Sequence, residues 1–177
     1  MSRVFSPDAV DPVDHVRGHA AAKLVVVEYG DFECPVCAQA HTAVQILLKK
    51  YGERMCFVFR NFPLTDLHPH AEHAAEAAEA AGAQGKFWEM HDRLFAHQLH
   101  LKETSLREYA RDIELDLQRF DFELKDQVYR QRVQEHIASG RRAEIRSTPA
   151  FFVNGRVVDV SFGMQRLEQA IEKALHA

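Results

Sequence analysis

The sequence predicts one α/β domain, in which a βαβ unit and a later ββα unit flank a long block of helices. Two runs of strand character, the β-branched 23–29 and the largely apolar 55–61, enclose a segment whose apolar residues recur at helical spacing. Residues 66–145 carry helical periodicity almost throughout, and strand character returns near residue 150. With 177 residues, of which 46% are hydrophobic, the chain is long enough for one such domain with its own core.

The first unit consists of two strands joined by one helix. Residues 23–29 predict a strand that is buried on both faces, because the run is almost wholly apolar. Residues 35–51 predict a helix that ends at Gly52, and residues 55–61 predict the second strand. A helical connection of this length favours parallel strands and a right-handed crossover.

The helical block is expected to contain at least four helices. Their predicted ranges are 70–81, 86–98, 105–115 and 117–145. Thr104 or Ser105 is expected to cap the third helix, with Glu108 placed to close a capping box. In the last range the apolar stripe shifts by five residues between Val128 and Val133, which predicts a break or kink there.

The C-terminal unit is predicted to be a hairpin followed by a helix. Residues 150–153 are apolar, and the pair Asn154-Gly155 is a strong signal for a two-residue turn. Residues 156–160 would form the partner strand, and residues 164–176 carry apolar positions at helical spacing.

Charge and hydropathy exclude two classes of partner. The 22 Lys and Arg residues are balanced by 26 Asp and Glu residues, and a net charge of −4 argues against nucleic-acid binding. No apolar run approaches the roughly 20 residues of a membrane span. Residues 1–20, with Asp8, Asp11, Pro12 and Asp14, resemble a loose polar arm rather than a signal peptide. We therefore expect a cytoplasmic protein, although a mature periplasmic or extracellular form without its leader would look the same.

The candidate reactive site is the sequence Cys34-Pro35-Val36-Cys37. Three cysteines are too few, and odd in number, for a disulfide-stapled scaffold. Cys34 stands at the predicted start of a helix, where free amides and the helix dipole favour a thiolate, and Pro35 fits the first turn. Cys37 lies one turn further on and can resolve a mixed disulfide at Cys34. Apolar Val36 should make this thiolate less extreme than a histidine there would.

The other interpretations of these residues are a metal site and an inert buried pair. Cys37 and His41 are one helical turn apart and could ligate zinc, but a structural zinc site needs four ligands and no second CxxC is present. The cluster of His68, His70 and His73 could also suggest a metal, although its spacing does not fix a coordination geometry. Cys56 is expected to be a buried apolar residue. The sequence therefore favours a redox pair and predicts no metal.

Four segments together resemble the DsbA-like thiol–disulfide oxidoreductases of the thioredoxin superfamily. Residues 26–37, VVEYGDFECPVC, are similar to the active-site segment of that family. The segments that resemble its helical insertion and its cis-proline loop are 60–70, 87–91 and 147–155. The resemblance implies a thioredoxin-like fold (βαβ…ββα) with an inserted all-helical subdomain. The core would comprise about residues 15–64 and 146–177, and the insertion about 65–145.

The resemblance also implies a substrate-binding loop beside the cysteines. Pro149 is expected to be cis and to pack against the pair, and Thr148 would offer its backbone to an extended peptide. Pro35 and Val36 would complete this surface. Ser147 stands where family members often have glycine, which affects only the expected shape of the loop.

Glu28 interrupts an apolar strand six residues before Cys34. A carboxyl group there would be partly buried with a raised pKa, and could accept the proton of Cys37 as that thiol attacks the mixed disulfide. The resemblance supports this role, because the family places an acidic residue at this position. The alternative is a side chain at a strand end that points into solvent.

These observations predict a dithiol–disulfide oxidoreductase. Its redox group would be the intramolecular Cys34–Cys37 disulfide, so no dissociable cofactor is expected. Its substrates would be thiol- or disulfide-containing proteins or peptides. The redox partner could be glutathione, the thioredoxin system or a membrane oxidase, and the direction of electron flow depends on the compartment. The alternatives are a kappa-type glutathione transferase or isomerase, which would not need Cys37, and a non-catalytic module that binds a client or zinc.

Overall fold

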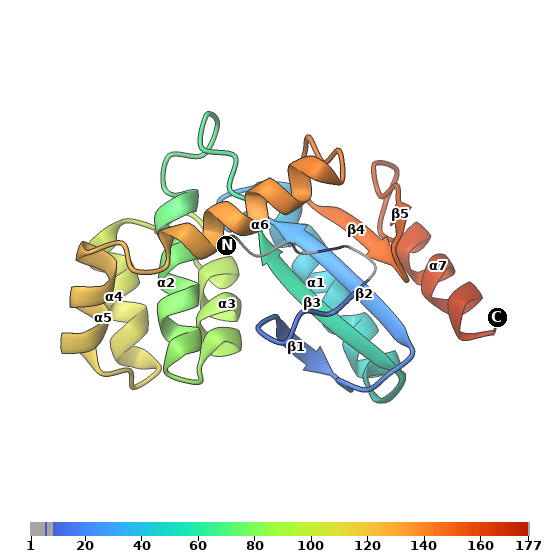
Figure 1. Cartoon of the computed structure of the whole chain (residues 1–177), viewed down its shortest axis with the longest axis horizontal. Helices are drawn as coiled ribbons and strands as arrows, with labels where there is room; N and C mark the ends of the chain where they lie inside the picture. The colour runs from blue at the N-terminus through green and yellow to red at the C-terminus, as the bar shows by residue number, and fades with distance from the viewer. Residues whose placement is uncertain (1–5, 7–8, 177) are drawn as a thin grey trace.

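The fold is built on a five-stranded mixed sheet (Figure 1). The computed structural model describes residues 6 and 9–176. The strands are β1 (His15–Gly18), β2 (Leu24–Gly30), β3 (Met55–Asn61), β4 (Ala150–Val153) and β5 (Arg156–Val158). They lie in the order β1-β3-β2-β4-β5, with β2 and β3 parallel and the other pairs antiparallel. The parallel pair of β2 and β3 and the hairpin of β4 and β5 are both as predicted, although β5 ends at Val158 rather than at residue 160.

The helices divide into those that cover the sheet and those that form a separate group. Their bounds are α1 (Pro35–Tyr51), the short 3-10 helix η1 (Gly52–Arg54), α2 (Ala71–Ala83), α3 (Phe87–Ala96), α4 (Glu103–Asp112), α5 (Leu117–Lys125), α6 (Arg130–Arg142) and α7 (Gln165–Leu175). Helices α2 to α5 gather beside the sheet, and α6 returns from them to β4 (Figure 1). The predicted break lies between α5 and α6, where Val128 is exposed.

Alternation along β2 and β3 separates two apolar clusters. Val26, Phe57 and Phe59 belong to the larger cluster, which also holds the buried residues of α1, α3 and α7. Val27 and Val58 belong to the smaller cluster, which α6 covers from the opposite face. The sheet is therefore buried on both faces, as the apolar run of residues 23–29 predicts.

Two local predictions are wrong. Helix α4 begins at Glu103 after Lys102, and no side chain caps it, so the capping box at Thr104 or Ser105 does not form. The described N-terminal region is not a loose arm, because residues 15–18 form β1, which pairs with β3, and Ala9 and Asp14 accept hydrogen bonds from Arg60. The sequence does not indicate β1 because the strand is short and half of it is polar.

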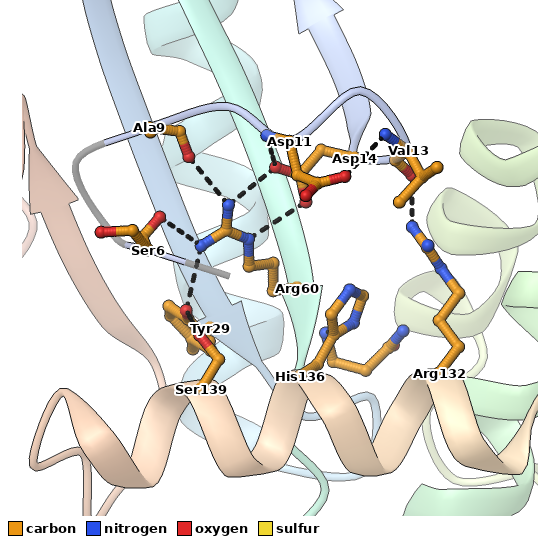
Figure 2. A network of polar contacts seen from close by, with 11 residues as sticks. Ser6, Ala9, Asp11, Val13, Asp14, Tyr29, Arg60, Arg132, His136 and Ser139 are labelled. Atoms are coloured by element: carbon orange, nitrogen blue, oxygen red, sulfur yellow. Dashed lines mark hydrogen bonds and ion pairs between the residues drawn. The ribbon is translucent and has the colours of Figure 1, made fainter. Parts of the chain in front are cut away.

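A buried ion pair fixes the segment before β1. The Arg60 guanidinium donates to both carboxylate oxygens of Asp14, at 3.0 and 2.7 Å, and both side chains are fully buried. It also donates to the carbonyl oxygens of Ser6 and Ala9, and to the Tyr29 hydroxyl. Figure 2 shows the guanidinium enclosed between this segment and helix α6. Asp8, which the sequence assigned to the same arm, lies outside the described residues.

Within residues 6 and 9–176, no helix has both the length and the apolar character required to cross a membrane.

Candidate active site

Cys34 caps the N-terminus of α1, and Pro35 occupies the first turn. The Cys34 backbone is extended (φ −76°, ψ 121°), and its carbonyl accepts the first helical hydrogen bonds, from the amides of Cys37 and Ala38. Cys34 is 6% exposed and Cys37 is fully buried, and both are free thiols. The chain therefore places both thiols at the N-terminal end of a helix, and Cys34 is the more exposed residue of the two.

The pKa values of the two thiols move in opposite directions. The hydrogen bond from the Cys37 thiol is the largest cause that lowers the pKa of Cys34 to about 5. A contact with Thr148 and the backbone amides of Cys37 and Val36 lower it further, while burial acts against them. Burial, followed by the interaction with Cys34, raises the pKa of Cys37 far above its ordinary value. The helix amides contribute as expected, but the neighbouring thiol contributes more.

The loop before β4 lies against Cys34. The Cys34 thiol approaches the carbonyl oxygen of Thr148 at 3.5 Å, although 114 residues separate them. The peptide bond between Thr148 and Pro149 is cis. Val36 is 53% exposed. The structure thus brings the four residues of the expected substrate surface to the region around Cys34, with Val36 facing solvent.

Glu28 is buried on β2 and does not point into solvent. It lies in register between Phe59 and Phe151 on the neighbouring strands, and it is 2% exposed. Within the described part of the chain its Oε1 atom has no hydrogen-bond partner. Burial, and then the charge of Cys34, raise the pKa of Glu28 to about 8. Its charge in turn raises the pKa of Cys37, so the carboxyl group and the dithiol are coupled.

Asp31 holds the loop between β2 and α1. Its carboxylate accepts hydrogen bonds from the amide of Glu33 at 2.7 Å and from the amide of Leu64 at 2.8 Å. It also pairs with His68 Nδ1 at 2.7 Å. Its own amide donates to Cys37 Sγ at 3.5 Å. The sequence patterns did not indicate a role for Asp31. In the structure Asp31 binds His68 and Glu33 binds His70, so the two acidic residues and the two histidines have the same spacing.

Gln98 is a second residue that the sequence did not indicate. Its side-chain amide donates to the carbonyl oxygens of Phe32 and Cys34, at 3.0 and 2.7 Å. These bonds attach the loop after α3 to the loop that carries the nucleophile. The neighbouring Leu99 is 92% exposed. No sequence signal distinguishes such a glutamine from a surface residue.

Two of the histidines considered as metal ligands, His68 and His70, bind carboxylates, whereas His41 belongs to a different candidate group. His68 binds Asp31, and His70 binds Glu33 through its amide and its Nδ1 atom. Among residues 6 and 9–176, one group of three possible ligands lies within 4.8 Å, namely His41, His91 and Asp92. It does not include Cys37. The carboxylate of Asp92 accepts two hydrogen bonds from Arg17, and that cation opposes a metal ion there.

Cys56 has the predicted structural position. It is fully buried on β3, and it pairs in register with Gly18 of β1 and Val25 of β2. It belongs to the apolar cluster on the α6 face, whereas Cys34 and Cys37 belong to the cluster on the α1 face.

Sequence comparison finds relatives that are much longer than this chain. The chain is 49% identical over 166 residues to the Na(+)/H(+) antiporter NhaA 1 of Salinispora arenicola, and 47% identical to NhaA 3 of Salinispora tropica. Each match covers 93% of this chain and 25% of the relative. The chain therefore spans about a quarter of the length of these relatives.

Structural comparison finds proteins of similar length and topology. A thioredoxin-like oxidoreductase from Silicibacter pomeroyi DSS-3 is 28% identical, with a TM-score of 0.83, and the match covers 94% of this chain and 95% of that one. Oxidised BdbD from Bacillus subtilis is 22% identical, with a TM-score of 0.85 and 98% of each chain covered. These likenesses confirm the α/β thioredoxin-like fold, and α2 to α6 occupy the place of the expected helical insertion. A family model described as thioredoxin matches residues 11–173, and the chain belongs to that family.

Proposed function

We propose that this chain is a thiol–disulfide oxidoreductase that uses Cys34 as nucleophile and Cys37 as resolving thiol. The observation that carries the proposal is the unequal pair. The pKa of Cys34 is about 5, so this thiol is ionised at neutral pH, while the buried Cys37 keeps its proton. Thiolate is the reactive form, and a pair divided in this way attacks through one defined sulfur.

The reaction balances without a dissociable cofactor. The Cys34 thiolate attacks a substrate disulfide, which forms a mixed disulfide and releases one substrate thiolate. Cys37 then loses its proton and attacks the Cys34 sulfur, which forms the Cys34–Cys37 disulfide and releases the second substrate thiol. Two electrons pass from the dithiol to the substrate, and the reverse sequence oxidises a substrate dithiol.

Glu28 is the proposed acceptor of the Cys37 proton. While Cys34 is a thiolate, its charge helps to keep the Glu28 carboxyl protonated. That charge disappears in the mixed disulfide, so the pKa of Glu28 falls at the step when Cys37 must be deprotonated. The burial of Glu28 and its coupling to both thiols support this role.

Proteins or peptides are the proposed substrates. Three apolar side chains next to the Cys34 loop are exposed: Val36 at 53%, Leu67 at 72% and Leu99 at 92%. Residues on either side of this loop thus offer contacts for the side chains of an extended chain, and Thr148 and Pro149 offer a backbone edge. The redox partner and the cytoplasmic location remain predictions.

Exchange assays on single cysteine variants test the function. Cys34→Ser should abolish both insulin reduction and peptide oxidation, because no nucleophile remains. Cys37→Ser should accumulate a mixed disulfide with the substrate, visible on a non-reducing gel. Cys56→Ala serves as the matched control and should keep its activity, because Cys56 lies on the other face of the sheet. Activity retained in Cys34→Ser would overturn the assignment.

The kappa-type alternative predicts a different result for the second cysteine. A glutathione transferase needs no resolving thiol, so undiminished activity in Cys37→Ala would favour that enzyme. Titration of the Cys34–Cys37 couple against glutathione gives its reduction potential, which decides the direction of exchange in a given compartment.

A further inference from the structure

A histidine–carboxylate pair, His68 and Asp31, lies at the loop that precedes the dithiol. His68 Nδ1 is 2.7 Å from an oxygen of Asp31, whose side chain is fully buried, while the His68 side chain is 18% exposed. Asp31 reaches the reactive pair through its backbone, because its amide donates to Cys37 Sγ and its carbonyl accepts from the Cys34 amide at 3.2 Å. The pair therefore joins the segment after β3 to the loop that holds both cysteines.

We propose that His68, as an imidazolium bound to Asp31, is a positioning residue that stabilises the Cys34 thiolate. This inference rests on the proposed function and deepens it, because it names the cation that balances the nucleophile's charge. Asp31, Cys34 and Glu33 are acidic groups whose charges act on His68. These groups outweigh the effect of burial and raise the pKa of His68, which favours the imidazolium near neutral pH.

The effect on Cys34 follows from two electrostatic contributions. An imidazolium near the thiolate lowers the energy of the ionised form directly. It also balances the charge of Asp31, which would otherwise be a buried carboxylate held only by the amides of Glu33 and Leu64 and would oppose a second negative charge. Coupling between two titrating groups is reciprocal, so the thiolate that raises the pKa of His68 is stabilised by His68 to the same extent.

The first experiment separates the charge of His68 from its hydrogen bond. In His68→Asn, the side-chain amide can take the place of Nδ1 and still donate to Asp31, but it cannot carry a positive charge. We expect the midpoint pH of Cys34 alkylation in the reduced protein to rise by about 0.5 to 1 unit, which is roughly a 3- to 10-fold loss of thiolate on the acidic side. Rates of iodoacetamide labelling, followed by mass spectrometry, give this midpoint.

Two further variants show whether the effect passes through Asp31. His70→Asn is the matched control, because His70 pairs with Glu33 in the same way but its side chain is 40% exposed, so a shift below about 0.2 unit is expected. In an Asp31→Asn background His68 loses the carboxylate that raises its pKa most, so adding His68→Asn should change the midpoint less than it does in the original protein. A full shift in that background, or an equal shift in His70→Asn, would refute the pairing.

A measurement on the unaltered protein gives an independent answer. Oxidation of the pair removes the thiolate, so the pKa of His68, followed by NMR titration of its imidazole, should be lower in the oxidised than in the reduced protein. An equal pKa in both states, or an unchanged midpoint in His68→Asn, would reject the inference. Both measurements report on Cys34 acidity without a substrate, so their failure is distinct from a failure of disulfide exchange.

Discussion

Arg60 and Glu28 lie on neighbouring strands and are both buried, but they differ in the number of polar contacts that their side chains make. Arg60 is fully buried on β3 and is bonded through Nε and both terminal nitrogens, to Asp14 among others. Glu28 is 2% exposed on β2, and within the described residues its Oε1 atom has no partner. The contacts of Arg60 hold it in its charged form, whereas the protonation of Glu28 depends on its burial and on the charge of Cys34.

The difference follows from the faces of the sheet. The Arg60 side chain meets Tyr29, whose hydroxyl is 2.6 Å from Ser139 of α6, so this cluster joins the sheet to the helix that leads to β4. Glu28 faces the side that α1 covers, where the dithiol lies. A paired buried charge keeps one protonation state, while the Glu28 carboxyl group, whose Oε1 atom has no partner among the described residues and whose pKa is about 8, can exchange a proton near neutral pH.

The largest expected effect comes from breaking the Arg60 cluster. Arg60→Met removes one partner of a buried ion pair and leaves the Asp14 carboxylate buried without its cation. We expect the free energy of unfolding to fall by about 3–5 kcal/mol, because an uncompensated buried charge remains. Urea denaturation of the reduced protein measures this loss.

An exposed ion pair provides the control for that experiment. Lys50 pairs with Glu168 at 2.8 Å, but its side chain is half exposed, so Lys50→Met should lower the free energy of unfolding far less than Arg60→Met does. The midpoint of Cys34 alkylation should not move in Arg60→Met. An unfolding free energy within about 1 kcal/mol of the original would contradict the structural role of the cluster.

The second prediction concerns the unpaired group. Glu28→Gln keeps the size of the side chain and removes the proton acceptor, so the attack of Cys37 on the mixed disulfide should slow by about 10- to 100-fold near neutral pH. Stopped-flow measurement of resolution, with a peptide disulfide as substrate, isolates this step. The unfolding free energy should not decrease, because the variant removes a carboxyl group whose burial is unfavourable. Resolution at the original rate would show that Glu28 is not the acceptor.

The sequence predicts the frame of the molecule well, because local patterns encode it. The apolar runs specify β2 and β3, and the Asn154-Gly155 turn specifies the hairpin of β4 and β5. The position of Cys34 at a helix start also follows from local sequence. The capping box fails because α4 begins at Glu103, before both residues expected to cap it.

The contacts that complete the site are mostly distant in sequence. Cys34 meets Thr148 across 114 positions, and Asp31 meets His68 across 37. No local periodicity encodes such pairs, and only the family resemblance placed Thr148 near the cysteines. The buried partner of Arg60 was likewise hidden, because Asp14 stands in a segment whose polar composition is typical of a loose arm.

The smallest expected effect tests whether a buried, unpaired carboxyl group implies chemistry by itself. Glu76 of α2 is 2% exposed, and in the described part of the chain its Oε2 atom has no hydrogen-bond partner. Burial, and then the charge of Glu72, raise its pKa to about 7. It is not among the groups that shift the pKa of Cys34 or Cys37, so Glu76→Gln should leave disulfide exchange unchanged.

The stability of this variant should instead depend on pH in a defined direction. A pKa that is higher in the folded than in the unfolded protein stabilises the fold below the unfolded value of about 4.5, and this stabilisation is lost as the pH rises through about 7. The original protein should therefore lose stability between about pH 5 and 8, and Glu76→Gln should not. The difference in the free energy of unfolding should shift in favour of the variant by on the order of 1 kcal/mol, measured by urea denaturation at both pH values. If this variant exchanges disulfides more slowly, then a buried carboxyl group affects the reaction without lying near the dithiol, and proximity to the cysteines would not explain the proposed role of Glu28.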